Sequence, residues 1–349
     1  MTGRVNPSLE AGPGTGDRSR DEPVLSVKDL KTYLFTRWGT VRAVDGVSFD
    51  LYPGETLGVV GESGSGKSML ALSLMQLTPQ PAARNMGGQI FLNGKDLLTL
   101  SDREMRSFRG RDISIILQDP HQSLNPVFSV GDQLREAISS HDRGIDRKTA
   151  RERAIEALRL VRVSAPERRL KSYPHQLSGG IKQRVVGAMA MAYRPKVLIA
   201  DEPTTALDVT IQSQYLRLLR QLQRETDVAI ILITHDFGVV AATCDRVAVM
   251  YAGQIVEHGT VREIFDHPRH PYTRALLASR PRVDADVERL PSIEGQPPSM
   301  ADMPVGCRFA PRCSYAIEIC RVDPPPVFEA SESHAAWCWR SKEQPWLQA

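Results

Sequence analysis

Short, largely apolar runs separated by glycine, proline and charged residues recur along this chain. Their lengths of four to eleven residues and their content of β-branched side chains predict β-strands. The later ones are apolar at almost every position, which is typical of strands buried on both faces of a parallel sheet. The predicted strands lie at residues 24–27, 41–51, 56–60, 197–200, 228–234 and 247–251.

Helical periodicity appears in two regions between these strands. An apolar segment at residues 67–77 follows a glycine-rich turn, and apolar positions between residues 130 and 163 repeat at the spacing of one helix face. The pattern therefore predicts an α/β core interrupted by a helical insertion at about residues 119–185. After about residue 268 the sequence becomes rich in Pro, Arg and Cys, which indicates a separate C-terminal element at residues 269–349.

The composition excludes several classes of protein. The chain has 349 residues, 41% of them hydrophobic, which suits two domains or one large domain with an appendage. Its net charge of +3 does not by itself indicate a nucleic-acid partner. The apolar runs are far too short to span a membrane. Residues 1–22 lack the apolar segment of a secretory signal and predict a disordered tail. We expect a cytoplasmic protein attached to the membrane only through partners.

The first candidate site is a phosphate-binding loop. The segment Gly61–Ser68 reads Gly-Glu-Ser-Gly-Ser-Gly-Lys-Ser and stands between a predicted strand and a predicted helix. Its glycines allow successive N–H groups to face phosphate oxygens, and the helix start favours the same anion. Lys67 would reach the β- and γ-phosphates, and the Ser68 hydroxyl would ligate Mg²⁺.

The second candidate site lies at the ends of two later strands. Asp201 follows the apolar run 197–200 and would hold the Mg²⁺ of the nucleotide. Glu202 beside it is the candidate general base for the attacking water. His235 directly follows the run 228–234, at the sheet edge where open α/β sheets gather ligand groups. It could contact the γ-phosphate and hold Glu202 and water in place.

The segment Leu177–Arg184, which reads Leu-Ser-Gly-Gly-Ile-Lys-Gln-Arg, stands upstream of the Asp201-Glu202 pair. This pairing resembles the signature and Walker B segments of ABC-type ATPases, and the resemblance covers about residues 23–268. It implies a P-loop NTPase core with an antiparallel β subdomain and an inserted helical subdomain. It also implies nucleotide contacts by Gly61, Ser63, Gly64, Ser65, Gly66, Lys67, Ser68 and Met69.

Further roles follow from the same resemblance. Gln118 matches the glutamine that joins the core to the helical insertion and senses Mg²⁺ and water, so Mg²⁺ is expected at Ser68, Gln118 and Asp201. Ala206-Leu207-Asp208 resembles the D-loop, which crosses the dimer interface. An aromatic ring is expected to stack on adenine, with Trp38 as first choice and Tyr33 as the alternative.

The signature segment implies a second subunit. In the family, the signature serine and glycines close over the γ-phosphate held by a partner's phosphate loop, so two ATP molecules lie between two subunits. Ser178, Gly179, Gly180 and Gln183 are accordingly expected to act in trans. The family more often has Met-Arg where this chain has Ile181-Lys182, a conservative change. A lone subunit is expected to bind ATP and hydrolyse it poorly.

Two segments narrow the resemblance to ATP-binding subunits of dipeptide and oligopeptide importers. They are residues 119–131, where His121-Gln122 departs from the usual Met-Thr, and Tyr173-Pro174-His175-Gln176. The implied partners are two membrane permeases, a second ABC ATPase and an extracytoplasmic substrate-binding protein, with no nucleic acid. The expected location is the cytoplasmic face of the membrane. Nickel, glutathione and antimicrobial-peptide importers use similar subunits, and a soluble ABC ATPase is the remaining alternative.

The C-terminal region carries four of the five cysteines. Cys307, Cys313, Cys320 and Cys338 lack the paired spacing of common zinc ribbons, although zinc, an iron–sulfur cluster and free thiols all stay open on chemistry alone. The stretch 270–277 resembles the start of the importers' C-terminal extension, and the segment 306–313 resembles one that binds a 4Fe–4S cluster. The resemblance thus implies a structural cluster on these four cysteines. Cys244 is expected to be a small buried residue.

Overall fold

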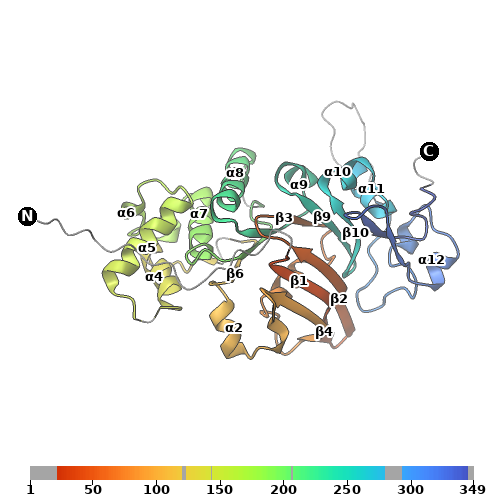
Figure 1. Cartoon of the computed structure of the whole chain (residues 1–349), viewed down its shortest axis with the longest axis horizontal. Coiled ribbons are helices and arrows are strands. Elements are labelled where there is room, and N and C mark those ends of the chain that lie inside the picture. Colours follow the sequence, from red (N-terminus) through yellow and green to blue (C-terminus); the bar gives the residue numbers. More distant parts are fainter. Residues whose placement is uncertain (1–21, 120–122, 143, 206, 280–292, 345–349) are drawn as a thin grey trace, which may run out of the picture.

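The computed structural model describes residues 22–119, 123–142, 144–205, 207–279 and 293–344. Its larger sheet has eight strands in the order β11-β12-β10-β9-β3-β8-β7-β6, and the neighbours from β9 to β6 run parallel (Figure 1). These parallel strands are β3 (Thr56–Val60), β6 (Ile113–Ile116), β7 (Val197–Asp201), β8 (Ala229–Thr234) and β9 (Arg246–Tyr251). The parallel core predicted from the apolar runs is confirmed.

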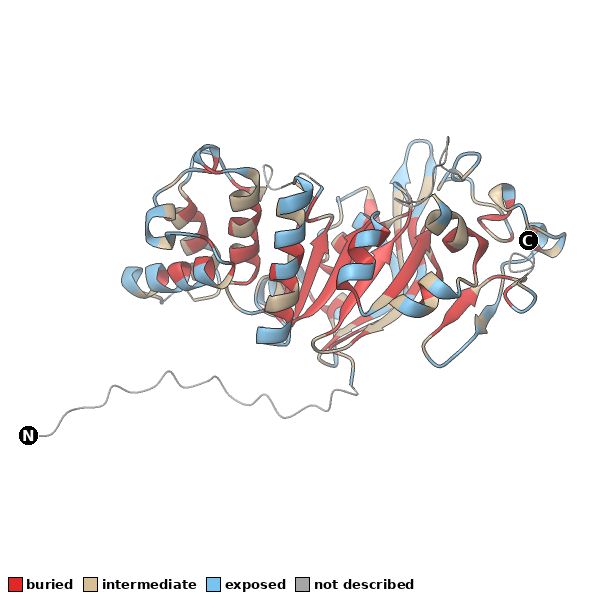
Figure 2. Cartoon of the chain, turned by 90° about the horizontal axis from the view of Figure 1, so that it is seen from above, coloured by how far each residue is buried: buried red, intermediate tan, exposed pale blue. Residues whose placement is uncertain are grey.

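The parallel strands are largely apolar because helices and the second sheet cover both of their faces. Every residue of β3, β7 and β8 is buried (Figure 2). Their carboxyl ends meet at one edge of the sheet, where β3 leads into α1 (Lys67–Leu74), β7 ends at Asp201 and β8 is followed by His235. This edge brings together the two candidate sites of the sequence.

The smaller sheet is antiparallel, with the order β2-β1-β4-β5. Its strands are β1 (Leu25–Thr36), β2 (Gly39–Leu51), β4 (Ala83–Leu92) and β5 (Lys95–Asp96). Buried residues of these strands share a hydrophobic cluster with Leu70 and Leu74 of α1 and with Leu57 and Val59 of β3. The expected antiparallel β subdomain is therefore present and packs beneath the phosphate loop.

The helical insertion forms one end of the molecule in Figure 1. It comprises α4 (Val130–Ser139), α5 (Arg147–Leu160), α6 (Pro166–Arg169), the short helix η2 (Pro174–Gln176) and α7 (Gly179–Ala190). The remaining helices of the core are η1 (Leu97–Thr99), α2 (Asp102–Phe108), α8 (Val209–Thr226) and α9 (Phe237–Thr243). The helix predicted at 67–77 ends earlier, at Leu74, because Gln76 takes a left-handed φ of 49°, which a right-handed helix cannot contain.

The C-terminal region predicted at residues 269–349 adds two strands to the large sheet. It is preceded by β10 (Gln254–Thr260) and α10 (Val261–Asp266) of the core, and its own elements are α11 (Pro271–Ala278), η3 (Ala310–Arg312), α12 (Ile319–Val322), β11 (Val327–Glu329) and β12 (Ala335–Trp337). Strand β12 pairs antiparallel with β10 and covers what would otherwise be an open edge. The local sequence pattern does not predict this pairing, because the two strands lie far apart in the chain.

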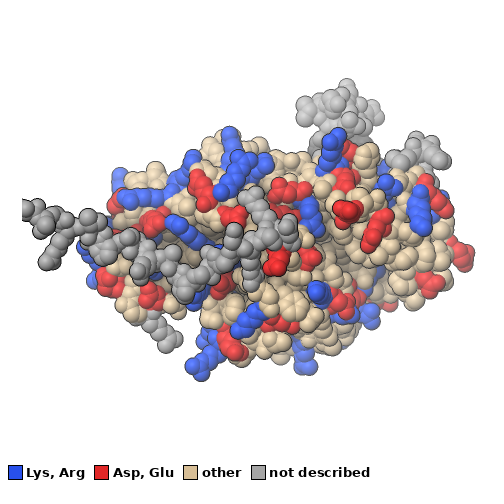
Figure 3. Space-filling view, viewed as in Figure 1, with Lys and Arg blue, Asp and Glu red and all other residues tan. Residues whose placement is uncertain are grey.

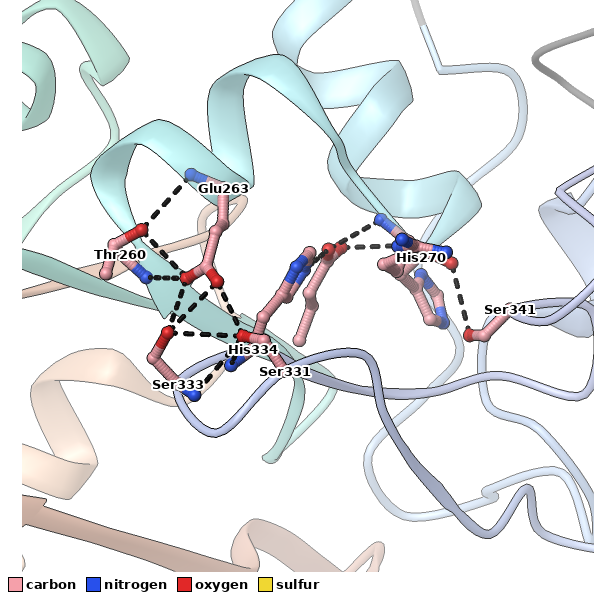
Figure 4. A network of polar contacts seen from close by, with 9 residues as sticks. Thr260, Glu263, His270, Ser331, Ser333, His334 and Ser341 are labelled. Atoms are coloured by element: carbon pink, nitrogen blue, oxygen red, sulfur yellow. Dashed lines mark hydrogen bonds and ion pairs between the residues drawn. The ribbon is translucent and has the colours of Figure 1, made fainter.

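A polar network fastens this region to the core (Figure 4). The Glu257 carboxylate of β10 is fully buried and accepts hydrogen bonds from the backbone N–H groups of Arg269 and His270, at 2.6 and 2.9 Å. His334 Nε2 lies 2.8 Å from the same carboxylate. A buried carboxylate is stable only when its oxygens have such partners, so this contact fixes the extension in one register.

Among the described helices, none is both long and apolar enough to cross a membrane.

Candidate nucleotide site

The phosphate loop encloses the Lys67 ammonium group. Lys67 Nζ donates to the carbonyl oxygens of Gly61 and Glu62, each at 2.8 Å, and only 6% of the residue is exposed. A Cβ at Gly61 or Gly66 would stand 2.1 Å from the carbonyl oxygen of Met250 or Ala43, so both positions require glycine. Burial lowers the pKa of Lys67, while nearby carboxylates oppose that shift.

Asp201 lies across from the loop at the end of β7. Its carboxylate is buried, receives a hydrogen bond from the Ser68 hydroxyl, and its Oδ1 has no protein partner in the described residues. Burial raises the pKa of Asp201, and the Ser68 hydroxyl counteracts this. A buried acceptor beside a serine hydroxyl is the donor set of a nucleotide-bound Mg²⁺, so Ser68 and Asp201 fit that ion.

Glu202 is surrounded by three polar side chains. Gln118 Nε2 and Thr205 Oγ1 both donate to Glu202 Oε2, at 3.0 and 2.9 Å, and His235 Nδ1 lies 3.2 Å from Oε1. Glu202 itself has a left-handed φ of 45°, a conformation that costs a residue with a side chain of the order of 1 kcal/mol. The structure thus brings together the three residues predicted to be catalytic, and it adds Thr205, which no motif in the sequence had singled out.

The two aromatic candidates lie in different surroundings. Tyr33 Oη donates to Asp45 at 2.5 Å, and burial together with this bond raises the pKa of Tyr33 to about 12. Trp38 stands at the β1–β2 turn with 78% of its surface exposed and the Arg37 guanidinium 4.5 Å from its ring centre. The Tyr33 hydroxyl is therefore already hydrogen-bonded within the protein, whereas the exposed Trp38 ring is accessible for stacking on a flat ligand.

The signature segment begins α7. Ser178 is exposed and occupies the N-cap position without a capping hydrogen bond from its side chain. Gly180 leaves room for Ile211 of α8, whose Cγ2 would lie 2.7 Å from an added Cβ. Gln183, expected to act in trans, is only 1% exposed, and its side chain contacts the buried Tyr215 of α8. Its side chain is not available at the surface that Ser178 presents.

Two other expected segments are described only in part. Asp208 of the D-loop is the N-cap of α8, where its carboxylate accepts the Ile211 N–H at 3.0 Å. Ala206, His121 and Gln122 lie outside the described residues.

Ser63 and Ser65 belong to the phosphate loop, and Gly64 of that loop has a φ of +76° with open space around an added Cβ. Met69 in the first turn of α1 packs against the smaller sheet's hydrophobic cluster.

The cysteines of the C-terminal region share one small cavity. Cys307, Cys313, Cys320 and Cys338 line it together with neighbours that include Phe309. All five cysteines of the chain are free thiols. In the described part of the chain, no group of three or more His, Cys, Asp or Glu side chains is arranged to hold a metal ion. Cys244 is buried against Gly58, as expected, and burial raises the pKa of its thiol to about 12.

Comparison with known proteins agrees with this geometry. Residues 44–205 match the ABC transporter family, and residues 256–320 match the C-terminal region of oligopeptide/dipeptide transporters. The chain is 53% identical over 319 residues to the dipeptide transport ATP-binding protein DppD of Bacillus subtilis, covering 91% of this chain and 95% of that relative. The chain belongs to the peptide ABC transporter ATP-binding proteins. It is accordingly an ABC-type ATPase with the ABC cassette fold.

A second relative and a solved structure support the same conclusion. The oligopeptide transport ATP-binding protein OppD of B. subtilis is 52% identical over 317 residues, which cover 90% of this chain and 88% of that relative. A solved dimeric ATP-binding cassette in a post-hydrolysis state, bound to ADP and Pi, superposes with a TM-score of 0.61 at 26% identity. It covers 68% of this chain and 99% of that cassette.

Proposed function

We propose that this chain binds MgATP on the Gly61–Ser68 loop and hydrolyses it with Glu202 as the general base. The observation that carries the proposal is the position of Glu202, whose two carboxylate oxygens contact Gln118, Thr205 and His235. Lys67 would bind the β- and γ-phosphates, Ser68 and Asp201 would hold Mg²⁺, and Gln118 would complete the ion's surroundings. His235 would keep the carboxylate and the attacking water aligned.

The decisive variant is Glu202→Gln, which keeps the shape of the side chain and removes the base. We expect MgATP binding to persist while the turnover number falls by about 10²–10⁴-fold. Glu225→Gln on α8 is the matched control, because that carboxylate is exposed and accepts a hydrogen bond from Gln221 of the same helix. A Glu202→Gln variant that hydrolyses ATP at close to the wild-type rate would reject Glu202 as the base.

We further propose that hydrolysis takes place between two ATPase subunits. The support is Ser178, an exposed helix N-cap whose hydroxyl is not used to cap its own helix. Together with the N–H groups of Gly179 and Gly180, it offers an anion site at the start of a twelve-residue helix. Asp208 of the D-loop would also contact the partner subunit. We expect the ATPase rate to rise with the square of the subunit concentration at low concentration. A rate strictly proportional to subunit concentration would contradict the proposal.

The relatives' names favour peptide import as the transport reaction. In this role the chain would sit on the cytoplasmic face of the membrane with two permeases, a related or identical ATPase and an extracytoplasmic binding protein. Val127 and Phe128, 71% and 49% exposed, offer apolar contacts to a permease helix. Figure 3 shows acidic and basic side chains interspersed over one face, which favours this role over a nucleic-acid-binding ATPase.

Copurification tests the transport role. The tagged chain would be isolated from membranes in mild detergent and its partners identified. Uptake of labelled dipeptide and oligopeptide would be compared with uptake of nickel, glutathione and an antimicrobial peptide. We expect permeases to copurify and di- or oligopeptides to be the substrates. Recovery without any membrane protein, together with tight DNA binding at physiological salt, would overturn the importer role.

We also propose that Cys307, Cys313, Cys320 and Cys338 hold a 4Fe–4S cluster as a structural staple. The support is the convergence of four thiols on one cavity, together with the chemistry of the donor set. A cluster, when bound, would supply cross-links between η3, α12 and the segment after β12.

Anaerobic purification tests this proposal directly. We expect about four iron and four sulfide per chain and a brown absorbance that is lost in a Cys313→Ser, Cys320→Ser double variant. Cys244→Ser is the control, because that buried thiol lies against Gly58, away from the cavity. A colourless, iron-free protein with one zinc per chain would replace the cluster with a zinc site, and protein without either metal would leave the thiols free.

A further inference from the structure

Glu62, the second residue of the phosphate loop, is held at three of its groups. Its backbone N–H donates to Tyr272 Oη at 2.8 Å, and its carbonyl oxygen accepts from Lys67 Nζ at 2.8 Å. Its carboxylate forms an ion pair with Arg312. Two of the three residues that contact Glu62, Tyr272 and Arg312, belong to the C-terminal region. They follow Glu62 by 210 and 250 residues in the sequence.

The Arg312–Glu62 pair has bidentate geometry. Arg312 Nη1 lies 2.7 Å from Glu62 Oε2, and Nη2 lies 3.0 Å from Oε1. The Arg312 side chain is only 4% exposed, whereas that of Glu62 is 27% exposed. A desolvated guanidinium fork imposes both a distance and an orientation on the carboxylate, which an exposed lysine would not do.

The surrounding protein fixes Arg312 itself. Its Nε donates to the Glu294 carbonyl oxygen at 3.0 Å, its Nη2 to that of Ile293 at 3.3 Å, and its Nη1 to Tyr251 Oη at 3.3 Å. These contacts leave the guanidinium few alternative positions. A side chain that is already ordered loses little further entropy when it binds, so Arg312 can act as a rigid support for the loop.

A second arginine of the same segment braces the other side of the loop. Arg308 forms a buried ion pair with Asp45 and donates to the Ala252 carbonyl oxygen at 2.5 Å. The next residue, Gly253, donates its N–H to the Ser65 carbonyl oxygen at 2.8 Å and accepts from the Asp45 N–H at 2.8 Å. Arg308 and Arg312 stand immediately inside Cys307 and Cys313, so one short segment contacts the loop directly through Arg312 and supports it indirectly through Ala252 and Gly253.

We infer that Arg312 is a positioning residue for the phosphate loop: by holding the Glu62 carboxylate, it keeps the loop and Lys67 in the conformation that receives ATP. The C-terminal extension thereby contributes to nucleotide affinity as well as to the edge of the sheet. This inference rests on the proposed nucleotide site at Gly61–Ser68. Without the pair, the loop must be ordered by the nucleotide itself, and that ordering weakens binding.

The test measures MgATP dissociation constants, KM and kcat for the full chain in its transporter complex. We expect Arg312→Gln to raise the dissociation constant and KM about tenfold while kcat stays within about threefold, because the pair acts on the loop and not on Glu202. Arg312→Lys, which retains the charge without the fork, should fall between Arg312→Gln and the wild type.

Two further variants separate positioning from folding. The double variant that carries both Glu62→Gln and Arg312→Gln should bind ATP no more weakly than Arg312→Gln alone, because each substitution removes the same interaction. The matched control is Arg246→Gln, which breaks an Arg–Glu pair with Glu55 at the opposite end of β3. We expect this control to lower thermal stability while leaving KM unchanged.

Each result decides between two explanations. An unchanged dissociation constant in Arg312→Gln, or additive losses in the double variant, would overturn the inference. An equal rise of KM in Arg246→Gln would also overturn it, because general destabilisation would then explain the effect. If Lys67→Ala still binds MgATP like the wild type, the proposed nucleotide site fails; if only Lys67→Ala weakens binding, the site stands and the role of Arg312 fails.

Discussion

Gln118 Nε2 donates to Glu202 Oε2 at 3.0 Å, across 84 residues of sequence. Gln118 follows β6 at the start of the helical insertion, whereas Glu202 follows β7 in the core. The hydrogen bond therefore connects the orientation of the insertion to the orientation of the candidate base. A movement of the insertion that carried Gln118 away would leave Glu202 with only Thr205 and His235.

This relationship predicts the effect of Gln118→Ala. The variant should still bind MgATP, but its turnover should fall by about tenfold because the Glu202 carboxylate loses one of the groups that orient it. Steady-state ATPase assays of the transporter complex would measure the loss. Gln221→Ala on the exposed face of α8 is the control, and a Gln118→Ala variant as active as that control would contradict the prediction.

Thr205 provides a separate test of how Glu202 is oriented. Thr205→Val preserves the shape of the side chain but removes the hydroxyl that donates to Glu202 Oε2 at 2.9 Å. We expect kcat to fall about three- to tenfold with an unchanged KM, because a hydrogen bond to a carboxylate is lost without any nucleotide contact. Thr205→Ser should restore kcat. A rise in KM instead would show that Thr205 contacts the nucleotide.

The aromatic contact to adenine can be resolved by ring removal. Trp38→Ala should weaken ATP binding by about tenfold, a typical value for the loss of one stacked ring, and Trp38→Phe should retain most of the affinity. Tyr33→Leu should instead lower thermal stability, because it leaves the buried Asp45–Arg308 pair without the Tyr33 hydroxyl. If Tyr33→Leu weakens binding and Trp38→Ala does not, the assignment is reversed.

Local pattern was sufficient to predict the buried strands β3, β7, β8 and β9, the glycine loop and the acidic strand end, whereas β4, β6 and β10 were not predicted. Largely apolar runs at 56–60 and 197–200 reflect burial on both faces, a property that each run carries within itself. The convergence of Glu202 and His235 also followed, because the ends of neighbouring parallel strands meet at one edge.

Contacts between distant segments could not be predicted in the same way. No periodicity in the sequence shows that β12 pairs with β10, or that Arg312 reaches Glu62. Nor does the motif containing Gln183 show that its side chain turns inward, since burial depends on the packing of α7 against distant elements such as α8. These features depend on tertiary packing, and only the three-dimensional structure specifies them.

Glu263 predicts a pH dependence for the attachment of the extension. This carboxylate closes the capping box of α10 with Thr260 and also accepts hydrogen bonds from Ser331 and Ser333 of the extension (Figure 4). Partial burial alone would raise the pKa of Glu263, but the hydrogen bonds from Ser331, Thr260 and Ser333 prevail and lower it from 4.5 to about 2. The folded protein thus favours the ionised form.

Because the folded pKa lies below the unfolded one, Glu263 stabilises the protein above about pH 4.5, and this stabilisation is lost as the pH falls toward 2. After allowance for solvent screening, we expect Glu263→Gln to lower the free energy of unfolding by about 1 kcal/mol at pH 7. The difference from wild type should shrink steadily between pH 4.5 and 2 in urea titrations. Carboxylates elsewhere titrate equally in both proteins, so they cancel in this difference. A difference that stays constant from pH 7 to pH 2 would mean that Glu263 contributes only shape and packing, and not its charge.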